Sequence, residues 1–133
     1  MDLELKEKTV FITGSTAGIG FATAKALLSE GAIVIINGRT STSVEAAINR
    51  LEQTFPNETI TGISADFSKQ NEVNSLLENL PKIDILINNV GVYSSGSFFK
   101  TEDAEWYRQF EVNVMSGVRL SRIILPSMLA NNW

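Results

Sequence analysis

The chain has 133 residues, which suits one domain, and its 44% hydrophobic and 20% charged residues are ordinary for a globular protein. The net charge of −4 without clustered Lys or Arg argues against a nucleic-acid partner, and the lack of Cys and His argues against disulfides and zinc. The charged start has no apolar core of a signal peptide, and no apolar run could cross a bilayer. We therefore expect a cytoplasmic protein with no membrane partner.

Four short apolar runs, rich in Ile and Val, predict strands at residues 10–12, 33–36, 60–65 and 83–87. Strands with one solvent-exposed face should alternate apolar and polar residues, whereas these runs are continuously apolar. Continuous apolar runs are typical of parallel strands covered on both faces. Helical patterns separate them. The alternation predicts an α/β domain with a parallel sheet and right-handed crossovers, and no linker or repeat divides it.

Local signals predict where the first helices begin and end. Gly31 is expected to cap the end of a helix over residues 19–28. Thr42 and Glu45 have the spacing of a capping box at the start of the second helix, and Ser68 is expected to cap the third.

The last third of the chain predicts a long helical stretch. Acidic side chains in the stretch Thr101-Glu102-Asp103 suit the positive end of a fourth helix. The pattern then continues over residues 106–129 and contains Pro126. Because Pro has no N–H to donate to the preceding turn, we expect a bend there.

Three glycines gather where the first strand meets the first helix. Gly14 ends the strand, and Gly18 and Gly20 lie at the helix start, where unpaired N–H groups and the helix dipole favour a phosphate. The alternative is a glycine-rich turn with structural duties alone. The spacing G-x-x-x-G-x-G matches neither the G-x-G-x-x-G fingerprint nor a phosphate loop ending in G-K-[ST].

Four motifs in register resemble those of the short-chain dehydrogenases/reductases. Residues 13–20, TGSTAGIG, match the family pattern T-G-x-x-x-G-I-G, and residues 88–91, NNVG, match N-N-A-G with Val for Ala. Asp66 follows the third predicted strand and Asn113 lies in the long helix, as in that family. The resemblance implies a Rossmann-type doubly wound parallel sheet over residues 1–133, the N-terminal half only, with four strands in the order 3-2-1-4 and helices on both faces.

The resemblance also implies a nicotinamide dinucleotide and the residues that bind it. The pyrophosphate would lie over the glycine turn, with contacts from Gly14, Ser15, Thr16, Gly18, Ile19 and Gly20. Asp66 would accept a hydrogen bond from the adenine amino group, or else serve only as a turn or helix-capping residue. Asn88 would lie beside the adenosine ribose, and Gly91 would shape a turn that also suits a plain strand end.

The end of the second predicted strand decides between NADP and NAD. Where an NAD enzyme of this family would carry an acidic residue, the chain has Gly38, followed by Arg39. A guanidinium would pair with a 2′-phosphate that a carboxylate would repel, so NADP is favoured over NAD. The alternative is a surface Arg that caps the turn. No basic residue lies within the glycine motif, which some NADP-preferring members carry.

The catalytic residues of the family are only partly present. The resemblance gives Asn113 a catalytic role, bending its helix and holding a water in a proton relay, against the alternative of a buried amide bonded to backbone. The family's Tyr-x-x-x-Lys pair is absent, because Tyr93 is followed four residues on by Ser97 and Tyr107 by Glu111. We therefore expect the cofactor-binding half of an enzyme acting on a small carbonyl or alcohol, inactive alone.

Two other readings stay open at this point: a non-catalytic dinucleotide-binding module, and an interaction fragment. The complete protein is expected to be a homo-oligomer. In the isolated chain we expect an exposed strand edge and an exposed apolar patch, and hence self-association. The residues expected in the patch are Val114, Val118, Ile124 and Leu125.

Overall fold

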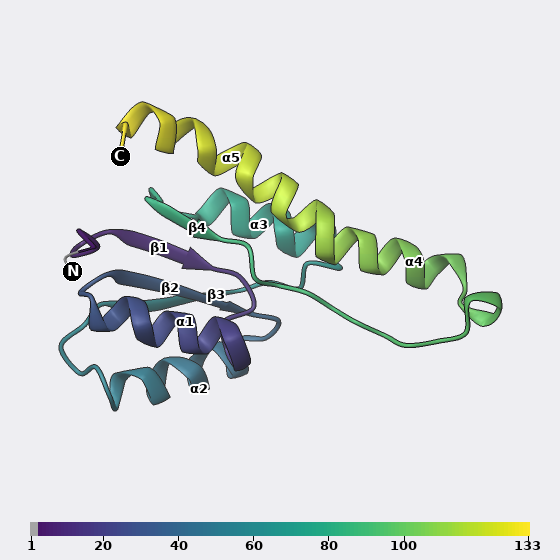
Figure 1. The fold of residues 1–133 in the computed structure, drawn as a ribbon, viewed down its shortest axis with the longest axis horizontal. Helices are drawn as coiled ribbons and strands as arrows, with labels where there is room; N and C mark the ends of the chain where they lie inside the picture. The colour runs from purple at the N-terminus through teal and green to yellow at the C-terminus, as the bar shows by residue number, and fades with distance from the viewer. Residues whose placement is uncertain (1–2) are drawn as a thin grey trace.

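A computed structural model of the chain describes residues 3–133, folded around a four-stranded parallel sheet (Figure 1). The strand order is β3-β2-β1-β4, as the family resemblance implied. The strands are β1 (Thr9–Ile12), β2 (Ile33–Gly38), β3 (Ile60–Ser64) and β4 (Ile85–Ile87). The hydrophobic first strand is therefore central, paired with both β2 and β4.

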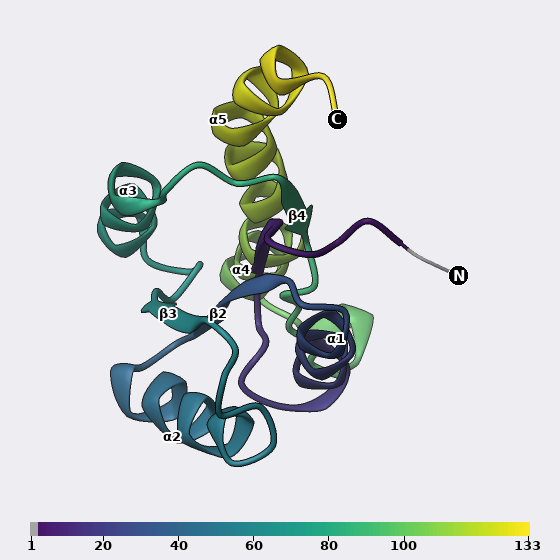
Figure 2. The same ribbon diagram turned by 90° about the vertical axis from the view of Figure 1, so that its left-hand side faces the viewer.

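Helices cover both faces of the sheet, which confirms the predicted layers (Figure 2). Val10 and Ile12 of β1 point to the face covered by α1 (Gly18–Ser29) and α2 (Ser41–Glu52). Phe11 between them points to the other face, which α3 (Gln70–Asn79) and the C-terminal helical stretch cover. Period-two alternation along a strand thus fills two separate cores, and this explains the continuous apolar runs.

The glycine stop of α1 is confirmed. Gly31 has a φ of 77° and its N–H donates to the carbonyl of Leu28, while the N–H of Ala32 donates to Leu27. This pair of bonds closes the helix end in the Schellman arrangement, which a left-handed glycine permits.

The predicted caps of α2 and α3 are wrong. The Thr40 hydroxyl accepts the Ser43 N–H at 3.2 Å and α2 begins at Ser41, so Thr42 lies inside the first turn. At α3 the cap position is one residue later than expected, and the hydroxyl of Ser68 donates to the preceding Asp66 carboxylate instead.

The C-terminal stretch is continuous but changes its winding. After the short 3₁₀ turn η1 (Phe98–Lys100), α4 (Asp103–Phe110) leads through a π-helical turn, η2 (Glu111–Met115), into α5 (Ser116–Asn131). The acidic start of α4 is confirmed by Asp103 and Glu105 in its first turn. Helix α5 runs through Pro126, and the winding changes at an earlier turn that was not predicted, the π-helical turn that carries Asn113.

An apolar surface along α5 and η2 is exposed, with one correction to its members. Val114, Val118 and Leu125 are 45%, 39% and 48% exposed, whereas Ile124 is only 4% exposed because it packs under the sheet with Leu120. Strand β4 pairs only with β1 among residues 3–133, so it forms an edge. Within that same range, none of the helices has the length and apolarity to traverse a bilayer.

Candidate functional site

A groove of about 940 Å³ opens at the carboxyl ends of the strands. Such ends are where parallel α/β sheets bind ligands, because the connecting loops diverge there. Its walls come from the glycine turn, the end of β2, the loop after β3, the loop after β4 and the start of the C-terminal helices. The lining residues are Gly14, Thr16, Ala17, Ile19, Asn37, Gly38, Arg39, Thr40, Ser43, Ala65, Asp66, Phe67, Lys69, Asn89, Val90, Gly91, Val92, Tyr93, Arg108 and Val112.

The three glycines of the first turn meet different requirements. Gly14 and Gly18 have φ of 60° and 57°, the left-handed region that favours glycine. A Cβ on Gly18 would meet nothing within 4 Å, so this position needs glycine for its φ and leaves the space above it open. A Cβ on Gly20 would come within 2.6 Å of the Gly14 carbonyl oxygen and 2.9 Å of the Ser15 Cα, so close packing requires this glycine.

Buried polar groups fix the glycine turn against β2. The Ser15 hydroxyl donates to the Ile12 carbonyl at 2.7 Å and accepts the Asn37 N–H at 2.9 Å. The Ser15 N–H donates to the Asn37 carbonyl, and the Asn37 Oδ1 accepts the Gly14 N–H. Ser15 therefore does not line the groove, and both of its donors are already used inside the turn. The role of Asn37 was not predicted.

A second set of bonds ties the same turn to the loop after β4. The buried Thr13 hydroxyl accepts the N–H groups of Asn89 and Val90, each at 2.9 Å. The Asn89 amide donates back to the carbonyls of Thr13 and Gly14. The two motif segments thus hold each other, a contact that was not predicted from the sequence.

At the end of β2, a side chain in place of Gly38 would require neighbouring side chains to shift. A Cβ there would lie 2.5 Å from Thr16 Cγ2 and 2.9 Å from Ser43 Oγ. Arg39 follows it, exposed and on the groove wall. The N-cap of α2 is made by the next residue, Thr40, and not by Arg39.

The loop after β3 brings a carboxylate between cations. Asp66 accepts the N–H of Ser68 at 2.9 Å and its hydroxyl at 2.7 Å. Partial burial raises the pKa of the Asp66 carboxyl, but the Ser68 bonds and the charges of Lys69 and Arg39 outweigh this and hold the pKa below its ordinary value. Asp66 stays ionised as a fixed acceptor on this wall.

The last wall is the loop after β4, held by the π-helical turn. The Asn113 amide donates to the Val92 carbonyl at 2.9 Å, and its Oδ1 accepts the Val92 N–H at 2.7 Å. Asn113 is exposed rather than buried, and its side chain is bonded to backbone. Asn88 lies outside the groove, its amide 3.4 Å from the Ser121 hydroxyl.

Comparison with known proteins agrees with this geometry. The profile described as short chain dehydrogenase matches residues 8–133. The chain belongs to the short-chain dehydrogenase family. It is 50% identical to an uncharacterized oxidoreductase, YvrD, and 43% identical to another, YvaG, both of Bacillus subtilis (strain 168). These alignments cover 99% and 97% of this chain but only 50% and 49% of the relatives, so the chain spans about half of their length.

Solved short-chain dehydrogenases share the fold. The L-sorbose reductase of Gluconobacter frateurii, in complex with NADPH and L-sorbose, is 30% identical with a TM-score of 0.89, over 98% of this chain and 51% of that one. A 3-oxoacyl (acyl-carrier-protein) reductase of Agrobacterium tumefaciens with NADP bound is 29% identical with a TM-score of 0.87, over 97% and 50%.

The structure of this short-chain dehydrogenase segment divides the predicted site residues into two groups. Those that line the groove are Gly14, Thr16, Ile19, Arg39, Asp66 and Gly91. Those that do not are Ser15, Gly18, Gly20, Asn88 and Asn113. Of the second group, Ser15, Gly20 and Asn113 make contacts that shape the loops around the groove.

Proposed function

We propose that the chain is the cofactor-binding half of an NADP(H)-dependent short-chain oxidoreductase that moves hydride between nicotinamide and a small carbonyl or alcohol. The observation that carries the cofactor choice is the end of β2. Gly38 stands where an NAD enzyme of this family would carry an acidic residue, and Arg39 is exposed beside it on the groove wall. A cation there without an acid favours a 2′-phosphate over a free ribose hydroxyl.

The residues present fit such a dinucleotide. Helix α1 begins at Gly18 after Ala17, which contributes no side-chain cap, so its first N–H groups are free of a capping side chain. They would hold the pyrophosphate, with the open space over Gly18 admitting it. Asp66, on the groove wall, would accept from the adenine amino group. The nicotinamide supplies or takes up the hydride when bound.

Relatives support the proposal. The two solved reductases named above carry NADPH and NADP. No Tyr-x-x-x-Lys occurs in the 133 residues, so the proton donor of the family would have to come from outside this segment. Asn113 would contribute by holding Val92 and the loop beside the reaction. We further propose that the complete protein is a cytoplasmic homo-oligomer.

The test is a cofactor titration of Arg39→Ala. A hydrogen bond to a charged group is worth roughly 1.5–3 kcal/mol, so NADPH affinity should fall about 10- to 150-fold. NADH affinity should hardly change, because NADH has no phosphate there. Lys25→Ala is the matched control, since Lys25 is an exposed cation of α1 that does not line the groove. Equal losses for both cofactors would make Arg39 structural.

A second candidate, an interaction fragment, is favoured by the exposed aromatic cluster of η1 and α4. Phe98 contacts both Phe99 and Trp106 edge-on, and all three are at least half exposed. NADPH titration of the purified chain separates the two readings, because only the cofactor-binding half binds NADPH. Light scattering and an NADPH-consumption assay against a carbonyl panel then test association and activity. We expect self-association without turnover. A monomer that turns over substrate would contradict the proposal that the proton donor lies outside this segment.

A further inference from the structure

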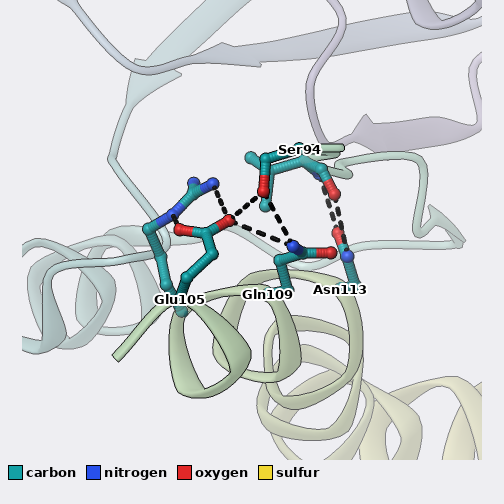
Figure 3. A network of polar contacts seen from close by, with 6 residues as sticks. Ser94, Glu105, Gln109 and Asn113 are labelled. Carbon is teal, nitrogen blue, oxygen red and sulfur yellow. Dashed lines mark hydrogen bonds and ion pairs between the residues drawn. The ribbon is translucent and has the colours of Figure 1, made fainter. Parts of the chain in front are cut away.

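Two polar side chains of α4 reach the loop after β4 ahead of Asn113. Glu105 and Gln109 lie one helical turn apart, and Asn113 follows at the same spacing (Figure 3). Figure 3 shows all three directed toward the loop, where Ser94 meets the first two and Val92 meets Asn113. The loop therefore follows the helix face, fixed at two points.

The Glu105 carboxylate is the centre of the first of these two attachments, the one made through Ser94. Its Oε1 accepts from the Ser94 hydroxyl, from Gln109 Nε2 at 3.0 Å and from Arg108 Nη2 at 2.7 Å. Its Oε2 accepts from Arg108 Nε at 2.7 Å. The Ser94 hydroxyl in turn accepts from Gln109 at 2.9 Å. Both carboxylate oxygens are thus occupied, and a bidentate Arg fixes the carboxylate in one orientation.

These contacts join two walls of the groove. Arg108 lines the groove from the helix side, and Asp66 lines it from the loop after β3. Tyr93, the neighbour of Ser94, lines the groove from the loop side. The same carboxylate therefore links Arg108 on one wall to Ser94 beside the other.

We propose that Glu105, acting through Ser94 and Arg108, is a positioning residue that pre-orders the nucleotide groove. The inference rests on the proposed function, since the ligand of the groove is taken to be NADPH. Glu105 does not line the groove itself. Its effect is to keep the loop and the Arg108 side chain in the bound arrangement before the ligand arrives, which spares binding the entropy of ordering them.

The test compares NADPH binding by Glu105→Gln, Ser94→Ala and Ser94→Thr in the 133-residue chain. If NADPH binding also has to order about one residue, the conformational-entropy cost lowers NADPH affinity roughly 5- to 30-fold. We expect that loss in Glu105→Gln and Ser94→Ala, with faster NADPH dissociation by stopped-flow fluorescence and faster amide exchange over residues 91–95. Ser94→Thr keeps the hydroxyl and should restore parent affinity.

The matched control is Ser95→Ala, because the Ser95 side chain is exposed and forms no hydrogen bond with any other residue in 3–133. If the attachment is merely structural, Glu105→Gln and Ser94→Ala will lower the melting temperature but bind NADPH as tightly as the parent, and Ser94→Thr will have no affinity to restore. That result would overturn the proposal. Equal weakening by Ser95→Ala would overturn it too. If the parent chain binds no NADPH, the proposed function itself is refuted, and the positioning role falls with it.

Discussion

Replacing Gly20 by Ala tests why a helix begins with glycine. A methyl group at this position would approach three atoms inside 3.0 Å: Asn89 Nδ2 at 2.5 Å, the Gly14 carbonyl oxygen at 2.6 Å and the Ser15 Cα at 2.9 Å. Two of the three belong to the main chain, so no side-chain rotation relieves the overlap. Helix α1 would have to move away from the end of β1.

The magnitude follows from two opposing terms. Overpacking of a well-packed site costs typically 1–3 kcal/mol, and contacts with main-chain atoms place this case near the upper end, about 3 kcal/mol. Replacing Gly by Ala inside a helix returns about 1 kcal/mol. The expected net loss is about 2 kcal/mol, and at roughly 4 °C per kcal/mol for a domain of this size the melting temperature should fall by about 8 °C.

Gly18→Ala is the comparison within the same motif. Its Cβ would meet no atom within 4 Å, and only the φ of 57° opposes it, at about 1–2 kcal/mol. Thermal unfolding and NADPH titration should therefore separate the two variants. Gly20→Ala should lose mainly stability, and Gly18→Ala should lose NADPH affinity beyond what its smaller stability loss explains.

The result that would refute this reasoning is a Gly20→Ala chain as stable as the parent or more so. Helix propensity alone predicts such a gain. Observing it would mean that α1 and the β1 turn separate without cost, and the packing role of Gly20 would have to be abandoned.

Two more predictions concern buried and charged bonds. Thr13→Val leaves the N–H groups of Asn89 and Val90 without their acceptor, so the free energy of unfolding should fall by about 2–3 kcal/mol in urea titrations, while Thr13→Ser stays near the parent. The Arg108 bonds, then those from Ser94 and Gln109, lower the pKa of Glu105 from 4.5 to about 2. Because this folded pKa is depressed, the contribution of Glu105 to stability is complete above pH 4.5 and is lost as the pH falls toward 2. In Glu105→Gln the free energy of unfolding should therefore depend less steeply on pH within that window, as measured by acid unfolding.

The fold was predictable from the sequence because the same strand and helix signals recur along the chain. Each strand is a short Ile/Val run, each is followed by a helix, and Gly31 ends α1 where propensity places it. The caps were less predictable. Four consecutive hydroxyl residues, Thr40 to Ser43, all suit a helix start, and only the backbone conformation selects Thr40.

Residues on the groove wall were predictable from the sequence where their position in the chain places them at a strand end. They were less predictable where tertiary contacts determine their position. Arg39 and Asp66 follow directly on strand ends, so their place at the groove was predictable. The Glu105 cluster was not, because Ser94 lies 11 residues away and only the course of the loop brings them together. The π-helical turn around Asn113 likewise depends on how α4 and α5 pack on the sheet.

The glycine turn and the NNVG loop, far apart in the sequence, form a single unit in the structure. Thr13 and Asn89 exchange hydrogen bonds, Gly20 lets α1 close against Gly14, and Asn113 holds the next residues of the loop through Val92. Each of these contacts joins a residue that lines the groove to one that does not. The wall residues at the groove are fixed by this layer behind them, so much of the cost of shaping the site is met in folding rather than in binding. That division explains why Gly20 and Asn113 belong to the motif pattern although neither lines the groove.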